Sequence, residues 1–172
     1  MLISVHQPVY LPGIIFFNKV ALSEVVVFIG NVQLEKSSWQ TRNQIRDGGS
    51  NNAQYLSVPI RSKGNYGQTI DQTKINGTHW VKKHLRSIFL TYKNRPYFDE
   101  YYNLIEILLT RKWENLSELN IAIIAELMGL LGISTKIIDA ADLSLAGSGT
   151  ERLVSICKEL NANGYISNKG AA

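Results

Sequence analysis

The chain has 172 residues, of which 45% are hydrophobic and 19% charged, the values of a globular protein long enough to bury its own core. Its longest apolar stretches are too short to span a bilayer, which argues against a membrane-spanning class. The net charge of +4 is small and includes no run of Lys or Arg, so we expect a phosphate-bearing small molecule rather than DNA or RNA as the partner. A mildly basic surface without any partner explains the charge equally well.

The length predicts one domain over residues 1–172. No basic and apolar leader follows Met1, and the single cysteine, Cys157, excludes an internal disulfide. Both features predict a cytoplasmic location.

A short apolar strand, Leu2 to Val5, runs into the sequence His6-Gln7-Pro8-Val9-Tyr10-Leu11-Pro12. Proline has no backbone N–H and disfavours helix in the residue before it, so the strand must end there in a stiff loop, here called the proline loop (residues 6–12). Ligands of open α/β sheets lie beyond the carboxyl ends of the strands. We therefore expect His6, Gln7 and Tyr10 to face a ligand crevice.

The next two segments complete a β-α-β unit. Gly13 to Leu22 has the apolar density of a short buried helix, and Val25 to Ile29 is a continuous apolar run typical of a strand covered on both faces. Such strands occur in parallel sheets.

A polar stretch from Gly30 to Arg46 follows, with no apolar period that defines an element. Its cations and its large ring suit the binding of a phosphate and the stacking of a base or sugar, whereas a solvated basic loop is the structural alternative. The candidate ligand-binding residues in this stretch are Gln33, Lys36, Ser38, Trp39, Arg42 and Asn43.

The remaining segments have clear patterns. A turn cluster at 47–52 before the alternating stretch Gln54 to Arg61 predicts a β-hairpin excursion around residue 50. Helical spacing, capping residues and short apolar runs predict a helical insertion and then a strand, a helix and a strand. The expected elements are helices from His79 to Lys93, Phe98 to Thr110 and Leu116 to Leu131, a strand from Thr135 to Asp139, a helix from Thr150 to Leu160 capped by Thr150, and a strand from Gly164 to Ser167.

His6 is the candidate catalytic residue, because a neutral imidazole can act as acid or base near pH 7. The alternative is that it caps the strand or pairs with a buried carbonyl. His79 and His84 do not lie on one helical face, so a zinc site is not expected there. No cofactor motif is evident, and the sequence leaves open whether the protein binds a divalent metal ion.

The glycine-rich segment 147–152 leads into the last helix, whose first N–H groups could receive an anion beside Arg152. An ordinary helix entry explains the segment equally well. Ser167, after the last strand, would lie at the carboxyl edge of the sheet.

Four segments together resemble the WbqC-like family of bacterial proteins over nearly the whole chain: HQPVYLPGIIFFNKV, VVVFIGNVQLEKSSWQTRNQI, LSVPIRSKG and TERLVSICKELNANGYISNKGAA. The resemblance implies a role beside O-antigen and other surface-polysaccharide enzymes, in modifying an activated sugar, with addition of an acyl or aminoacyl group to an amino sugar as the specific expectation. The residues that match the family pattern are His6, Gln7, Pro8, Tyr10, Pro12, Lys19, Gln33, Ser38, Trp39, Arg42, Asn43, Arg152 and Ser167.

Three positions depart from the family pattern. Gly13 replaces a usual Trp, Gly30-Asn31 replaces an acidic pair, and Asn168 replaces a Gly. Loss of the acidic pair matters most, since a carboxylate at a strand end could hold a metal or orient a base. Relatives continue for some tens of residues, so we expect the carboxyl end to be truncated.

The sequence thus predicts an α/β fold, Rossmann-like, with a mainly parallel sheet, a β-hairpin excursion and a helical insertion. The leading functional hypothesis is a transferase acting on a nucleotide-linked sugar, with His6 as acid or base, Arg42 and Lys36 as phosphate ligands and Trp39 as a stacking platform. The alternatives are a non-catalytic nucleotide-sugar binding or scaffolding protein of the same pathway, and a nucleotidylyltransferase-like enzyme. The last lacks the second histidine of that class.

Overall fold

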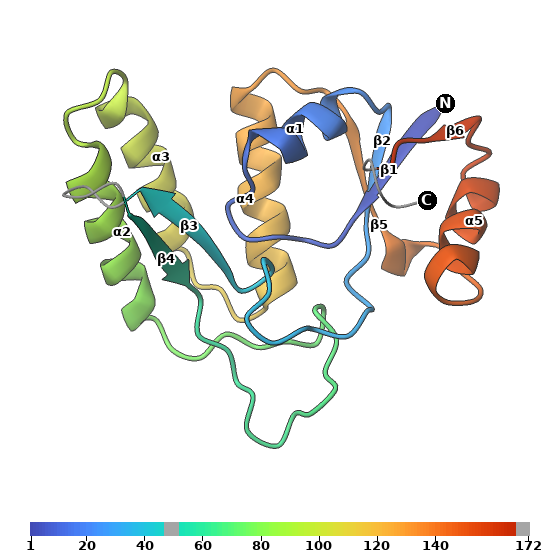
Figure 1. The fold of residues 1–172 in the computed structure, drawn as a ribbon, viewed down its shortest axis with the longest axis horizontal. Coiled ribbons are helices and arrows are strands. Elements are labelled where there is room, and N and C mark those ends of the chain that lie inside the picture. Colours follow the sequence, from blue (N-terminus) through green and yellow to red (C-terminus); the bar gives the residue numbers. More distant parts are fainter. Residues whose placement is uncertain (47–51, 168–172) are drawn as a thin grey trace.

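A computed structural model describes residues 1–46 and 52–167 (Figure 1). Four strands form one sheet in the order β5-β2-β1-β6, and all three neighbouring pairs are parallel. The fold is therefore mixed α/β with a parallel sheet, as predicted. The strands are β1 (Leu2–His6), β2 (Val25–Phe28), β5 (Lys136–Asp139) and β6 (Gly164–Tyr165).

Helices cover both faces of this sheet (Figure 1). Side chains alternate along a strand, so Val25 and Val27 pack towards one layer while Val26 and Phe28 pack towards the other. The first layer contains α5 (Gly149–Glu159) and the short 3-10 helix η1 (Ala140–Asp142), and the second contains α1 (Ile14–Ala21) and α4 (Leu116–Leu130). Every residue of β2 is buried, which explains its unbroken apolar sequence.

A second group of elements, here called the hairpin lobe, packs on the other side of α4 (Figure 1). It consists of the antiparallel strands β3 (Arg42–Arg46) and β4 (Ala53–Ser57) and the helices α2 (His79–Tyr92) and α3 (Phe98–Thr110). Leu56 of β4 and Trp80 of α2 lie in the same buried cluster as Leu119 of α4. The apolar contacts of α4 thus join the lobe to the sheet layers.

Most of the predicted elements are confirmed, the hairpin among them, although its turn falls partly on residues 47–51, outside the described residues. Two predictions were wrong in detail. The stretch predicted as a loop contains β3, whose polar side chains are tolerated because the two-stranded ribbon leaves one side to solvent. The last helix begins at Gly149 with Ser148 at the N-cap, so Thr150 lies inside the first turn and does not cap it.

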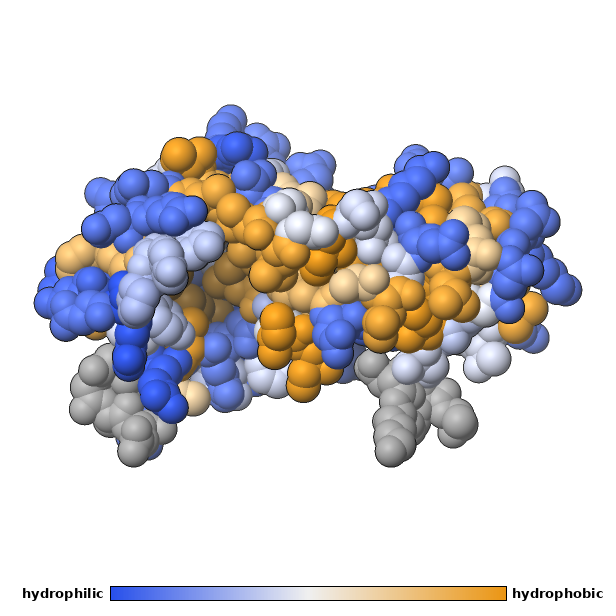
Figure 2. Space-filling model, turned by 90° about the horizontal axis from the view of Figure 1, so that it is seen from above, coloured by the Kyte–Doolittle hydropathy of each residue, from blue (hydrophilic) through white to orange (hydrophobic). Residues whose placement is uncertain are grey.

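Helix α1 is less buried than its composition predicted. Phe17 and Val20 are buried, whereas Ile14 and Ile15 are 71% and 81% exposed. Figure 2 shows apolar residues gathered on this face of the molecule. A pocket of about 310 Å³ lies there, lined by apolar residues from the start of α1, from α3 and from the end of α4.

No described helix combines the length and the apolar character needed to cross a bilayer.

Candidate functional site

The strand order changes direction between β1 and β6. β2 lies beside β1, and β5 lies beside β2 on the same side. The chain then crosses back, so that β6 lies on the other side of β1. At such a point the two loops leave the sheet in opposite directions, and open parallel sheets bind their ligands in a crevice at the carboxyl edge beside it. His6 ends β1 at this edge, and Ser167 follows β6.

His6 is held in a half-buried position by its neighbours. Its carbonyl accepts a hydrogen bond of 2.8 Å from the Ile29 N–H, and its ring lies 4.6 Å from the Phe16 ring, centroid to centroid. The Nε2 atom is buried, and within residues 1–46 and 52–167 it has no hydrogen-bond partner. Burial, and then the positive charge of Lys19, lower the pKa of His6 to about 4. The imidazole is therefore neutral at pH 7, and its Nε2 is a polar atom without a partner among the described residues.

Lys19 is the second basic group at this place, in the last turn of α1. Its Nζ lies 5.7 Å from the centre of the Tyr165 ring, on β6. Burial lowers the pKa of Lys19, and no Asp or Glu of the described chain pairs with it. The prediction of site residues from the sequence left Lys19 out of the substrate-binding set, although it matches the family pattern. The signal that could have found it is a lone lysine within an apolar helix.

The proline loop and the segment 38–43 lie side by side. The Tyr10 N–H donates to the Trp39 carbonyl at 2.9 Å, and the Gln40 side chain donates to Oε1 of Gln7. The Asn43 side chain donates to the carbonyls of Tyr10 and Leu11. The structure thus brings together the histidine-bearing loop and the arginine-bearing segment that the sequence placed in one site.

A buried amide joins these two segments to α4. Asn120 is fully buried, and its Nδ2 donates to the carbonyls of Pro8 and Gln40, at 2.9 Å each. Sequence reasoning missed this residue. A lone Asn among the apolar residues of a helix was the available signal, because a buried amide needs partners.

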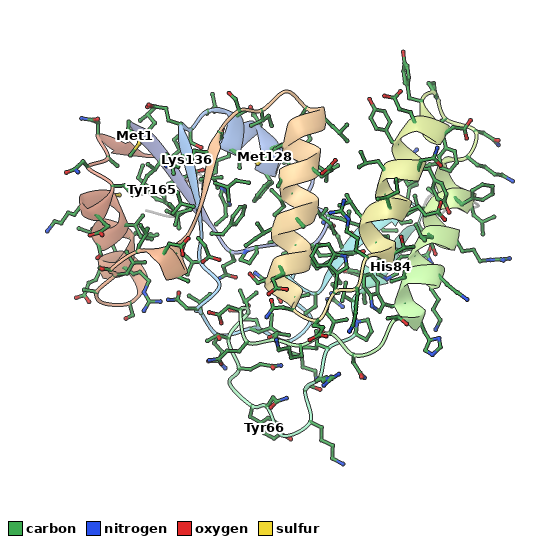
Figure 3. The ribbon with its side chains drawn as sticks, turned by 180° about the vertical axis from the view of Figure 1, so that it is seen from behind. Met1, Tyr66, His84, Met128, Lys136 and Tyr165 are labelled. Atoms are coloured by element: carbon green, nitrogen blue, oxygen red, sulfur yellow. The ribbon has the colours of Figure 1, made fainter. Side chains whose placement is uncertain are left out.

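Tyr10 does not face the crevice, which corrects its predicted orientation. The side chain is fully buried, its hydroxyl lies 2.9 Å from Nδ1 of His84, and burial raises its pKa well above the usual range. Its neighbour Trp80 packs edge-on against the ring. Tyr10 therefore anchors the proline loop in the hairpin lobe, where His84 is labelled in Figure 3. A tyrosine between prolines gives no sign of its side-chain direction.

The candidate phosphate ligands are less close together than the sequence suggested. The Arg42 guanidinium lies 4.3 Å from the centre of the Tyr55 ring, within the hairpin lobe. Lys36 is exposed and Trp39 is 53% exposed. None of the described contacts joins the side chains of these three residues to His6. Their roles as phosphate ligands and stacking platform stay predictions.

Three further candidates come from this stretch, Gln33 and Ser38 before β3 and Asn43 within it. Gln33 is exposed and forms an isolated antiparallel bridge with Thr69. The Oγ atom of Ser38 is buried and has no hydrogen-bond partner within the described ranges, while the Ser38 carbonyl accepts from Thr41. The side chain of Asn43 donates its hydrogen bonds to the backbone of the proline loop and so has a structural role.

Arg152 lies in the first turn of α5, and its side chain reaches the segment that follows β2. Its Nη1 donates to Oδ1 of Asn31 at 3.1 Å, and its Nε donates to the Gly147 carbonyl at 3.1 Å. Asn31 stands at one of the positions where the resembling family carries an acid. Arg152 therefore contacts a neutral side chain here, and no ion pair within residues 1–46 and 52–167 involves it.

No group of three or more His, Cys, Asp or Glu side chains that could hold a metal ion occurs within the part of the chain that the structure describes. A requirement for a divalent ion stays a prediction.

The basic residues are concentrated rather than spread over the chain. Residues 36–95 contain eleven of the 18 Lys and Arg residues and two of the 14 Asp and Glu residues. This range includes most of the hairpin lobe and the loops that lead into it. The small net charge is therefore the sum of a positive range, residues 36–95, and a rest of the chain that has more acidic than basic residues.

Comparison with known proteins identifies the family. The sequence model of the WbqC-like protein family matches residues 7–172. The uncharacterized protein Rv1507c of Mycobacterium tuberculosis is 32% identical over 170 residues, which are 98% of this chain and 73% of that relative. No solved structure matches the chain. The chain belongs to the WbqC-like protein family.

Proposed function

We propose that this protein is a transferase that modifies a nucleotide-linked amino sugar in the synthesis of a bacterial surface polysaccharide such as O-antigen. We also infer that its sheet is Rossmann-like. The sheet has the strand order β5-β2-β1-β6. If its four strands are numbered by their order along the chain, this is the order 3-2-1-4, which is found at the centre of doubly wound nucleotide-binding sheets.

The observation that carries this proposal is the buried, unpartnered Nε2 of His6 at the point where the strand order changes. Buried polar groups are normally paired, so an orphan beside a crevice is a candidate for contact with substrate. A nucleotide-linked substrate would place its diphosphate among basic groups, and Lys19 and Arg152 both lack an acidic partner within the described chain.

The chemistry proposed for His6 is proton transfer. The amine of the sugar attacks the carbonyl carbon of an activated acyl donor, an ester or thioester, and the new C–N bond forms. Neutral His6 accepts the proton that the amine loses, and the leaving oxygen or sulfur departs with the electron pair of the broken bond and takes that proton. A free base with a pKa of about 4 is weak, but an anion bound beside Lys19 offsets the charge that lowers this pKa.

The first test is a thermal-shift panel of nucleoside diphosphate sugars, with and without divalent ions, followed by a transfer assay on each binder. His6→Ala is compared with His79→Ala, which removes an exposed histidine of α2. We expect binders to raise Tm in both variants and transfer to fall at least 100-fold in His6→Ala alone. Transfer by His6→Ala at the unmutated rate would remove the role assigned to His6.

The non-catalytic alternative is favoured by the neutral Arg152–Asn31 contact, since a site that lacks the acidic pair lacks one means of orienting a base. A protein of this kind would give thermal shifts with nucleotide sugars and no transfer with any donor. If neither shift nor transfer occurs, both proposals fail.

The charge of residues 36–95 favours one further candidate, nucleic-acid binding. It predicts an affinity that falls steeply with salt, because bound phosphates release counterions. Filter binding at two ionic strengths tests it.

A further inference from the structure

We propose that Lys19 and His6 together form the anion-binding part of the crevice between β1 and β6, and that the anion they take is the diphosphate of the substrate. The identity of that substrate rests on the proposed function, whereas the existence of the anion site does not.

The placement of the two residues is the first argument. β1 ends at His6, whose ring contacts Phe16 of α1, and α1, the next element, carries Lys19 in its last turn. Phe16, one turn before Lys19 in α1, holds the His6 ring at 4.6 Å. Tyr165 of β6 holds the Lys19 ammonium at 5.7 Å from its ring centre. The two basic groups are thus held by one contact from α1 and one from β6.

The second argument is the missing countercharge. The ion pairs of the described residues are those of the amino terminus with Glu24 and of Lys112 with Glu114, and neither involves this place. A half-buried ammonium normally has a carboxylate partner, because burial penalises an unpaired charge. A cation–π contact with Tyr165 and a position near the carboxyl end of α1 stabilise Lys19 in part. Neither contact satisfies the free Nε2 of His6.

The titratable neighbours agree with this arrangement. Burial lowers the pKa of both Lys19 and His6, and the charge of Lys19 lowers that of His6 further. The groups that face the pair are Tyr165 on β6 and, beyond it, Cys157 on α5, and on β2 the residue opposite His6 is the apolar Phe28. None of these is a carboxylate. A bound anion would favour the charged forms of both basic groups and would raise both pKa values.

A phosphate group fits this pair better than a single carboxylate. Its oxygens can accept from an ammonium and from an imidazole at once, and its second negative charge matches a second cation if His6 becomes protonated. The experiment therefore compares the two chemistries directly, with inorganic pyrophosphate in one arm and acetate in the other.

The test is isothermal titration calorimetry of the full chain at pH 7.5 and low salt, with the wild type and three variants. Lys19→Gln removes the charge, Lys19→Arg keeps it, and Lys158→Gln is the matched control, since Lys158 also lies in the last turn of its helix, α5. We expect pyrophosphate to bind the wild type, Lys19→Arg and Lys158→Gln within about threefold of one another, and Lys19→Gln at least tenfold more weakly. We expect acetate to bind all four at least tenfold more weakly than pyrophosphate binds the wild type.

A second measurement locates the anion. The ring proton signals of His6, assigned by comparison with His6→Gln, should shift on titration with pyrophosphate in the wild type and not in Lys19→Gln. The proposal is overturned if Lys19→Gln, folded by circular dichroism, binds like the wild type, or if the His6 signals do not move. Lys19-dependent binding of pyrophosphate without sugar transfer would leave the anion site standing and end the proposed function. Full transfer activity in Lys19→Gln would end the proposed anion site and leave the proposed function standing.

Discussion

The buried pair Tyr10–His84 offers a sharp test of how the proline loop is anchored. The Ser57 carbonyl can only accept a hydrogen bond, so Nε2 of His84, 3.2 Å away, must carry the proton. Burial lowers the pKa of His84 to about 4, so the ring is neutral at pH 7 and Nδ1 is an acceptor. The Tyr10 hydroxyl, 2.9 Å from Nδ1, is therefore the donor.

Tyr10→Phe removes this donor and leaves the packing of the ring almost unchanged. The buried Nδ1 of His84 then has no partner, which costs about 1 to 3 kcal/mol of the free energy of unfolding. For a chain of this size each kcal/mol lowers Tm by about 2 to 4 °C, so we expect a decrease of about 2 to 12 °C.

Urea unfolding at pH 7, followed by circular dichroism, measures the change in free energy. Tyr66→Phe is the control, because Tyr66 is 95% exposed and its hydroxyl can be replaced by water; Tyr66 and His84 are labelled in Figure 3. We expect the control to lie within about 0.5 kcal/mol of the wild type. If Tyr10→Phe is as stable as Tyr66→Phe, the hydroxyl does not donate to His84 and the anchoring argument is refuted.

Two further predictions concern stability. His6 and His84 both have a pKa of about 4 instead of 6.5, so the unfolded chain binds more protons than the folded chain between these pH values. The free energy of unfolding is therefore unaffected by these two groups above pH 6.5. It decreases as the pH falls towards 4, by about 2 to 3 kcal/mol for each histidine. Urea midpoints at pH 7, 5.5 and 4.5 check this, and a constant midpoint would contradict it. Asn120→Ala leaves two buried carbonyls without their donor and should cost about 2 to 4 kcal/mol, whereas Asn103→Ala, on the exposed side of α3, should cost less than about 0.5 kcal/mol in the same assay.

Local patterns were enough to predict most elements of the fold. The unbroken apolar run of β2 and the strand before the first proline could be read directly, because burial on both faces and the geometry of proline act locally. The same holds for α3, whose predicted and observed limits agree at Phe98 and Thr110. Strand β3 was missed because its only strongly apolar residue is Ile45. Its extended conformation is stabilised by antiparallel pairing with β4, which its own sequence does not indicate.

The candidate site could be predicted only in part, because strand order and side-chain direction are tertiary properties. Placing His6 at the carboxyl end of a strand needed only the prolines, and the nearness of the proline loop and segment 38–43 was part of the hypothesis that put His6 and Arg42 in one site. The burial of Tyr10 depends on His84, 74 residues later, and the stacking of Arg42 on Tyr55 depends on the pairing of β3 with β4. The change of strand order beside β1 depends on β6, the last strand of all.

Helix α4 has an unusual position, since its two sides belong to different apolar clusters. Leu119 and Ile123 pack with the hairpin lobe, while Ile124 and Met128 pack against the sheet. A shortened chain without α2 and α3 would leave the Leu119 side of α4 in water, and a fragment ending before α4 would remove residues from both clusters. We therefore expect limited proteolysis to yield no stable half-molecule. Natural variants should tolerate changes in loop length far better than the loss of either group of elements.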